Sequence, residues 1–139
     1  MIEISPYAGV GPMRFGMSPT ETVEHLGQPQ AVSTNRSSET VQRYSTMLLT
    51  YDAEGLAEVG IFPEGEARLG SLDPLTREGL AALIAEDGEA QDVLGFVVLL
   101  NLGITVTGVH DDDHAQRAVT AFRRGRWDRL HASMKPFSL

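Results

Sequence analysis

The sequence predicts an α+β fold with one curved antiparallel sheet of about six strands and two main helices packed on one face. Two segments, 19–26 and 74–86, combine helix-start signals with apolar residues at helical spacing. Other apolar segments are short, rich in β-branched or aromatic residues and bounded by turn residues, which is typical of strands. Each helical segment precedes about three extended ones, so the chain can be a doubled helix-then-meander unit.

The first elements along the chain are two short extended pieces and a helix. Residues 2–4 alternate between apolar and polar side chains, and residues 13–15 form a second extended piece. Ser18 offers a hydroxyl cap, and Pro19 occupies the first helical position. These signals predict a short helix over 19–26.

A hairpin follows the polar loop at 34–38. Residues 41–45 and 47–51 read as extended chain that can form one long strand. Residues 52–55 form a turn, because the glycine at its end accepts the positive φ that hairpin turns need. Residues 56–62 then pair back on the preceding strand, with one apolar face and one mixed face.

The second half of the chain repeats this order of elements. Asp73, followed by a proline, starts the helix over 74–86. Segments 93–100 and 102–109 have strand composition, although the first is short enough to be a buried helical turn instead. Residues 118–122 form the last predicted strand.

The length of 139 residues suits a single domain, within which 1–63 and 64–130 are possible halves and 131–139 a basic tail. The chain has no cysteine, which excludes disulfides, thiol catalysis and cysteine-based zinc sites. No apolar run approaches the roughly 18 residues of a membrane span, and the start of the chain lacks the pattern of a secretory signal. We therefore expect a soluble, cytoplasmic protein that does not bind membranes.

The charge is negative overall and uneven along the chain. The formal net charge of −8 argues against nucleic acid as a partner. Residues 64–114 hold eleven acidic and two basic residues, whereas residues 115–139 hold six basic residues and one acidic residue. Either the two regions neutralise each other on one folded surface, or the acidic region attracts a basic protein partner.

The segment from His110 to His114, with three aspartates between the histidines, is the one cluster of metal-ligand residue types. On a helix, two histidines four residues apart could chelate zinc or nickel. The segment lies between two predicted strands, however, where a solvated loop is expected. No serine lies in a Gly-x-Ser-x-Gly motif, no phosphate-binding loop is present and no carboxylate pair stands out. We assign no catalytic residue, metal ligand or cofactor.

Two local patterns resemble known bacterial families. Residues 15–29 resemble the opening of small domains similar to the beta-lactamase inhibitor protein and the outer-membrane assembly lipoprotein. That resemblance implies a helix paired with an antiparallel meander, a unit that the inhibitor doubles. Residues 102–106, 118–122 and 125–128 resemble the end of small immunity proteins encoded beside polymorphic toxins. The second resemblance implies a protein that masks a toxin.

These observations predict a non-enzymatic, cytoplasmic immunity protein that neutralises a basic bacterial toxin by covering its active site. The alternative is a small-molecule- or metal-binding domain, or a small enzyme, that uses the loop from His110 to His114. The sequence does not distinguish a monomer from a dimer. The predicted partner-binding residues are acidic: Glu86, Asp87, Glu89, Asp92, Asp111, Asp112 and Asp113.

Overall fold

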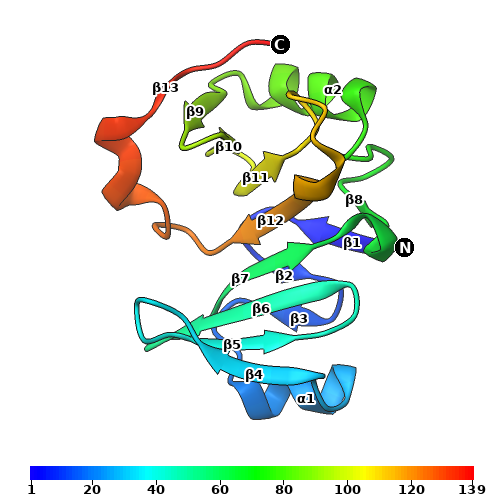
Figure 1. The fold of residues 1–139 in the computed structure, drawn as a ribbon, viewed down its shortest axis with the longest axis vertical. Coiled ribbons are helices and arrows are strands. Elements are labelled where there is room, and N and C mark those ends of the chain that lie inside the picture. Colours follow the sequence, from blue (N-terminus) through cyan, green and yellow to red (C-terminus); the bar gives the residue numbers. More distant parts are fainter.

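The computed structural model describes all 139 residues and contains two β-sheets and two α-helices (Figure 1). The main sheet has nine antiparallel strands in the spatial order β13-β9-β10-β11-β12-β7-β6-β5-β4. Its strands are β4 (Ala31–Thr34), β5 (Thr40–Arg43), β6 (Met47–Asp52), β7 (Gly55–Ile61), β9 (Gln91–Val93), β10 (Phe96–Leu99), β11 (Ile104–Thr107), β12 (Ala118–Phe122) and β13 (Lys135–Pro136). The α+β class is confirmed.

A smaller sheet forms from the start of the chain and a segment in the middle. Its strands lie in the order β3-β2-β1-β8, and β1 pairs antiparallel with β2 and parallel with β8. They are β1 (Ile2–Ser5), β2 (Gly9–Val10), β3 (Met13–Arg14) and β8 (Ala67–Arg68). The helices are α1 (Pro19–Leu26), α2 (Arg77–Asp87) and three short 3₁₀ helices, η1 (Pro63–Gly65), η2 (His114–Gln116) and η3 (Asp128–Ser133).

The prediction of about six strands is wrong because several strands lack a signal of their own. All four residues of β4 are exposed, so this strand shows no alternation between apolar and polar positions. The apolar run 93–100 is not one strand or a helical turn, since it turns at Leu94 and Gly95 between β9 and β10. Segments 41–45 and 47–51 likewise form two paired strands, β5 and β6, rather than one.

The two predicted helices are present, but only the first starts where expected. The Ser18 hydroxyl accepts from the Glu21 amide at 3.2 Å, and the Glu21 carboxylate accepts from the Ser18 amide at 3.1 Å. The second helix begins at Arg77 rather than at residue 74, because Thr76 caps it. Neither helix is long and apolar enough to cross a membrane.

Each helix is followed by a four-stranded antiparallel meander (Figure 1). Strands β4 to β7 follow α1, and strands β9 to β12 follow α2. The last strands of the two meanders, β7 and β12, pair antiparallel at the centre of the main sheet. The order of elements is therefore doubled about this central pair, with four strands in each meander rather than the expected three.

The main core lies between one face of the main sheet and the elements that cover it. Leu49, Val59 and Ile104 from the sheet, together with Leu80 and Leu83 from α2, belong to a single buried cluster. The small sheet adds side chains to the same cluster, and α1 packs against it. Both helices therefore lie on the same face of the main sheet.

The chain that follows β12 covers the opposite face of the main sheet, on the side of the second meander. Phe122 is 1% exposed there and forms a second cluster with Val93 and Val98. Trp127 packs edge-on against Phe96, with ring centroids 5.3 Å apart. Aromatic contacts of Trp127 thus hold the chain that follows β12 against this second face of the main sheet.

Candidate functional site

The seven predicted partner-binding residues lie at the two ends of α2 (Figure 1). One group occupies the last turn of α2 and the residues that follow it: Glu86, Asp87, Glu89 and Asp92. The other group, residues 111–113, lies near the start of the helix, because Asp112 lines a hollow together with Thr76 and Arg77. The eleven residues of α2 rise about 1.5 Å each and separate the two groups by about 16 Å.

Asp87 is a structural residue rather than part of the exposed surface. It is 5% exposed, and its carboxylate accepts from the backbone amides of Asn101 at 2.9 Å and Leu102 at 3.1 Å. It also accepts from the Glu89 amide at 3.2 Å. Burial raises the pKa of this carboxyl above its ordinary value, while the amides oppose that shift. Asp87 therefore ties the end of α2 to the turn between β10 and β11 and is not available to a partner.

The loop at 111–113 offers two unpaired carboxylates. Asp112 accepts from Arg117 Nη2 at 2.9 Å and lies 3.3 Å from His114 Nε2. Asp111 and Asp113 are exposed and form no ion pair. Arg117 also donates to the Gly108 carbonyl, so its pair with Asp112 helps to fix the shape of the loop.

The remaining predicted residues, Glu86, Glu89 and Asp92, are exposed and without an ion pair. Asp92 lies opposite Lys135 in the register of β9 with β13. Glu78, in the first turn of α2, is also exposed and unpaired. Sequence analysis did not select Glu78, although its position on the polar side of the predicted helix is the signal that could have identified it.

The basic end of the chain forms few direct ion pairs with this acidic region. Only the pair of Arg117 with Asp112 joins residues 115–139 to residues 64–114. The other ion-paired arginines of the basic end contact carboxylates of the first meander instead. The exposed acidic residues of 64–114 that form no ion pair are Glu64, Glu66, Glu78, Glu86, Glu89, Asp92, Asp111 and Asp113.

The two histidines of the His110–His114 loop have different surroundings. The His110 ring packs edge-on against Phe137, with centroids 5.4 Å apart, and its buried Nδ1 has no hydrogen-bond partner. The His114 side chain is 73% exposed. No group of three or more His, Cys, Asp or Glu side chains is arranged to hold a metal ion.

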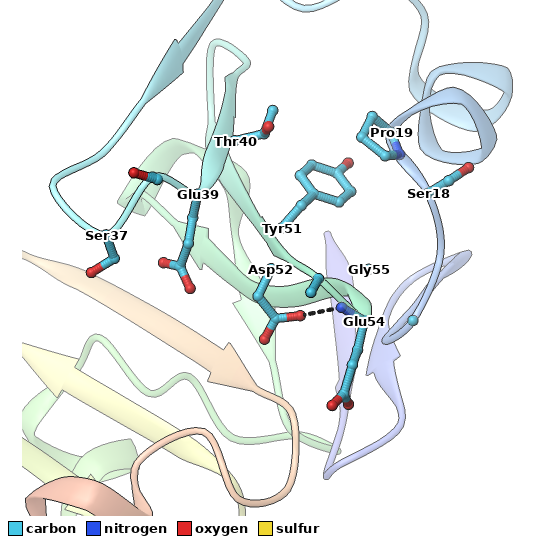
Figure 2. Close-up of a pocket in the computed structure, with 12 residues that line it drawn as sticks. Ser18, Pro19, Ser37, Glu39, Thr40, Tyr51, Asp52, Glu54 and Gly55 are labelled. Atoms are coloured by element: carbon cyan, nitrogen blue, oxygen red, sulfur yellow. Dashed lines mark hydrogen bonds between the residues drawn. The ribbon is translucent and has the colours of Figure 1, made fainter.

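The largest hollow, of about 820 Å³, lies at the other end of the molecule from α2, and sequence analysis did not identify it (Figure 2). It is bounded by the start of α1, the loop at 37–40 and the turn at 52–55. Tyr51 forms part of its wall, where its hydroxyl bonds with Gln42 and Thr22. Burial raises the pKa of Tyr51 to about 12, so this hydroxyl stays protonated.

Two carboxylates that line this hollow, those of Glu39 and Asp52, are already held by arginines. Arg126 makes two bonds to Glu39, at 2.5 and 2.9 Å, and its Nε lies 3.3 Å from a Glu58 oxygen. Arg123 pairs with Asp52 at 2.5 Å. These hydrogen bonds lower the pKa of Glu39 to about 2 and lower that of Asp52. The hollow is therefore backed by a network that fastens the chain after β12 to the first meander.

Comparison of the chain with protein-family models, with curated proteins and with solved structures finds no match.

Proposed function

We propose that the protein is a protein-binding module that neutralises a basic bacterial toxin in the cytoplasm by covering its active site. One observation carries the proposal: exposed carboxylates without ion-pair partners gather along α2 and in the segments at its two ends. We call this set the α2 acidic surface. Its members are Glu78, Glu86, Glu89, Asp111 and Asp113.

The charge balance of this surface favours a basic partner. On α2 itself, one exposed basic residue, Arg77, stands against Glu78 and Glu86. Three further carboxylates of the surface, those of Glu89, Asp111 and Asp113, lie beyond the ends of the helix. Such a surplus attracts a positively charged protein over several ångströms and raises the rate of association, most strongly at low salt. A toxin that acts on nucleic acid has a basic active site, so the same surplus would bring this surface to the site that must be covered.

The scaffold beneath the α2 acidic surface is rigid, which reduces the entropy lost when it binds. Leu80 and Leu83 are at most 1% exposed. The Thr76 hydroxyl caps the helix by accepting from the Gly79 amide at 3.0 Å. Asp87 fixes the other end of the helix, as described above. A preorganised surface of this kind loses less free energy to ordering than a flexible loop does.

The available area is sufficient for a stable complex. A standard interface buries about 800 Å² on each partner. That is roughly a tenth of the 7315 Å² of exposed surface on this chain. One helix with its flanking loops can therefore supply the surface that the proposal needs.

The proposal is tested with the proteins encoded by the genes adjacent to the one for this chain. Each is produced in bacteria alone and together with this chain, and growth is followed. We expect one neighbour to arrest growth, this chain to restore it, and the purified pair to form a complex whose association rate falls as salt rises.

Two matched variants then locate the surface. Glu86→Gln with Asp113→Asn removes one charge from each end of α2, whereas Glu24→Gln with Asp128→Asn removes two exposed charges elsewhere. We expect the first variant to slow association about three- to tenfold at low salt and the second to leave it nearly unchanged. Equal effects from both variants would show that the α2 acidic surface is not the docking surface. If none of the adjacent gene products arrests growth or binds this chain, the proposed function itself is rejected.

A further inference from the structure

The turn that joins β9 and β10 contains a residue that is poorly suited to it. Val93 pairs with Phe96, so the turn consists of two residues, Leu94 and Gly95. Their φ angles are +54° and +85°, as in the type I′ turn that suits right-twisted hairpins. Glycine accepts these angles freely, and asparagine or aspartate commonly accepts the first of them. Leucine does not, because its Cβ crowds the backbone in this region.

Leu94 gains no burial in exchange for this conformation. Its side chain is 78% exposed, and it belongs to neither buried apolar cluster. Tyr7 provides the contrast, since it also has a positive φ, of +60°. The Tyr7 ring packs against Phe122 and under Arg124, and its hydroxyl donates to a backbone carbonyl. Contacts within the fold explain the conformation of Tyr7, but none explains that of Leu94.

The turn holds Leu94 in a fixed position. Val93, directly before it, is 4% exposed, and Phe96, directly after the turn, packs against Trp127 at 5.3 Å. Strand β9 is also paired on both of its sides, with β10 and with β13. An exposed apolar side chain on such a rigid hairpin loses little entropy when it enters a pocket, which is the property of an interface anchor.

We propose that Leu94 is the apolar anchor of the complex, inserting into an apolar pocket on the toxin that is bordered by basic side chains. This inference rests on the proposed function and names the contact that gives the complex its affinity. The basic border is inferred from the acidic residues that precede the anchor in the chain. Glu86, Glu89 and Asp92 are exposed in the residues that lead to Leu94, and Lys135 faces Asp92 from β13. The carboxylates would control the association rate, and Leu94 would control the dissociation rate.

The test is Leu94→Asn, because asparagine fits the first position of the turn better than leucine does. We expect its melting temperature to rise by about 2–4 °C while its affinity for the growth-arresting neighbour falls at least about tenfold, mainly through faster dissociation. The control is Val32→Asn. Val32 is the matched exposed apolar residue, 63% exposed on β4, and its replacement should leave the affinity unchanged.

The outcomes separate this inference from the proposed function. If wild type and Leu94→Asn bind the neighbour equally well, the anchor is refuted while the complex stands. If Leu94→Asn lowers the melting temperature, leucine is not strained in this turn. That result would refute the strain argument, and the assignment of Leu94 as an anchor would fail with it. Equal losses of affinity in Leu94→Asn and Val32→Asn would also refute a specific anchor. If wild type binds none of the adjacent gene products, the proposed function fails and this inference fails with it.

Discussion

Replacing Arg126 with methionine removes the centre of the ion network behind the largest hollow. The Arg126 side chain is 15% exposed and contacts three carboxylates, those of Glu39, Glu58 and Asp52. Methionine keeps much of the length and apolar volume of the arginine stem but has no charge and no N–H donor. The variant therefore leaves three carboxylates near one another, with Arg123 still paired to Asp52.

The pKa of Glu39 sets the scale of the expected loss. It is lowered from its ordinary 4.5 to about 2, chiefly by hydrogen bonding to Arg126, which corresponds to about 3 kcal/mol. The Glu39 side chain is 15% exposed, so water and salt screen part of this energy. We expect Arg126→Met to lower the free energy of unfolding by about 2 kcal/mol at pH 7.

The loss should depend on pH in a defined direction. The pKa of Glu39 in the folded protein lies below its ordinary value, so the stabilisation is present above about pH 5 and is lost as the pH falls towards 2. The lowered pKa of Asp52 is caused first by its bond to Arg123, which the variant keeps, so Asp52 adds little to the difference. The difference between wild type and Arg126→Met should therefore shrink as the pH falls from 7 to 3.

Urea unfolding measures both quantities. Fluorescence of Trp127, the only tryptophan, reports on the C-terminal segment, and far-UV circular dichroism reports on the sheet. Arg129→Met is the control, since Arg129 is exposed and unpaired, and it should change stability by less than about 0.5 kcal/mol. Equal stability of wild type and Arg126→Met at pH 7, or a loss that does not change with pH, would refute the role assigned to this network.

Two further variants test buried contacts by urea unfolding. Tyr51→Phe removes a hydroxyl that bonds with Gln42 and Thr22, and should cost about 1–2 kcal/mol at pH 7. Because the folded pKa of Tyr51 is raised to about 12, this stabilisation should be present below about pH 10 and be lost as the pH rises through 12. An ultraviolet titration of Tyr51→Phe should lack a tyrosine that ionises near pH 12 in the wild type. Gly79→Ala should destabilise by about 2 kcal/mol despite alanine's higher helix propensity, since the new Cβ would lie 1.8 Å from the Asp73 carbonyl oxygen. An unchanged or higher stability of either variant would contradict the packing described.

The parts of the fold that the sequence predicts correctly are those with local causes. The Ser18 hydroxyl caps α1 as expected, and Glu21, three residues later, completes a capping box with it. The turn at 52–55 forms for the same reason, with the Asp52 carboxylate accepting from the Glu54 amide at 2.8 Å. Both motifs are complete within a few residues, so distant contacts are not required to specify them.

The start of α2 shows why a local signal can mislead. Asp73 followed by proline resembles a helix cap, but the Asp73 carboxylate accepts from the Leu75 amide and forms a turn before the helix. The Asp73 backbone carbonyl then lies against Gly79, where a side chain would collide with it. Thr76 therefore takes the capping position, three residues later than predicted.

The hollow near α1 could not be predicted, because its residues have no common spacing in the sequence. Glu39 lies directly before β5, Asp52 ends β6 and Glu58 lies in the middle of β7, and the arginine that joins them is Arg126. Only the pairing of these strands, and the return of the chain after β12, brings the four side chains together. Charge patterning suggested that the basic end of the chain neutralises residues 64–114, whereas Arg123 and Arg126 pair with carboxylates of the first meander.

Two arginines of the basic end are paired far from the α2 acidic surface and do not compensate it. Arg123 and Arg126 serve to hold the chain after β12 against the first meander, so they are not available near α2. Repulsion among the carboxylates at α2 then opposes folding, and salt screens that repulsion. A surface that only had to be soluble could reduce this cost by placing a lysine among them. Retaining the surplus along α2 and at its two ends is advantageous if a positively charged partner binds there, and this is the physical basis of the proposed function.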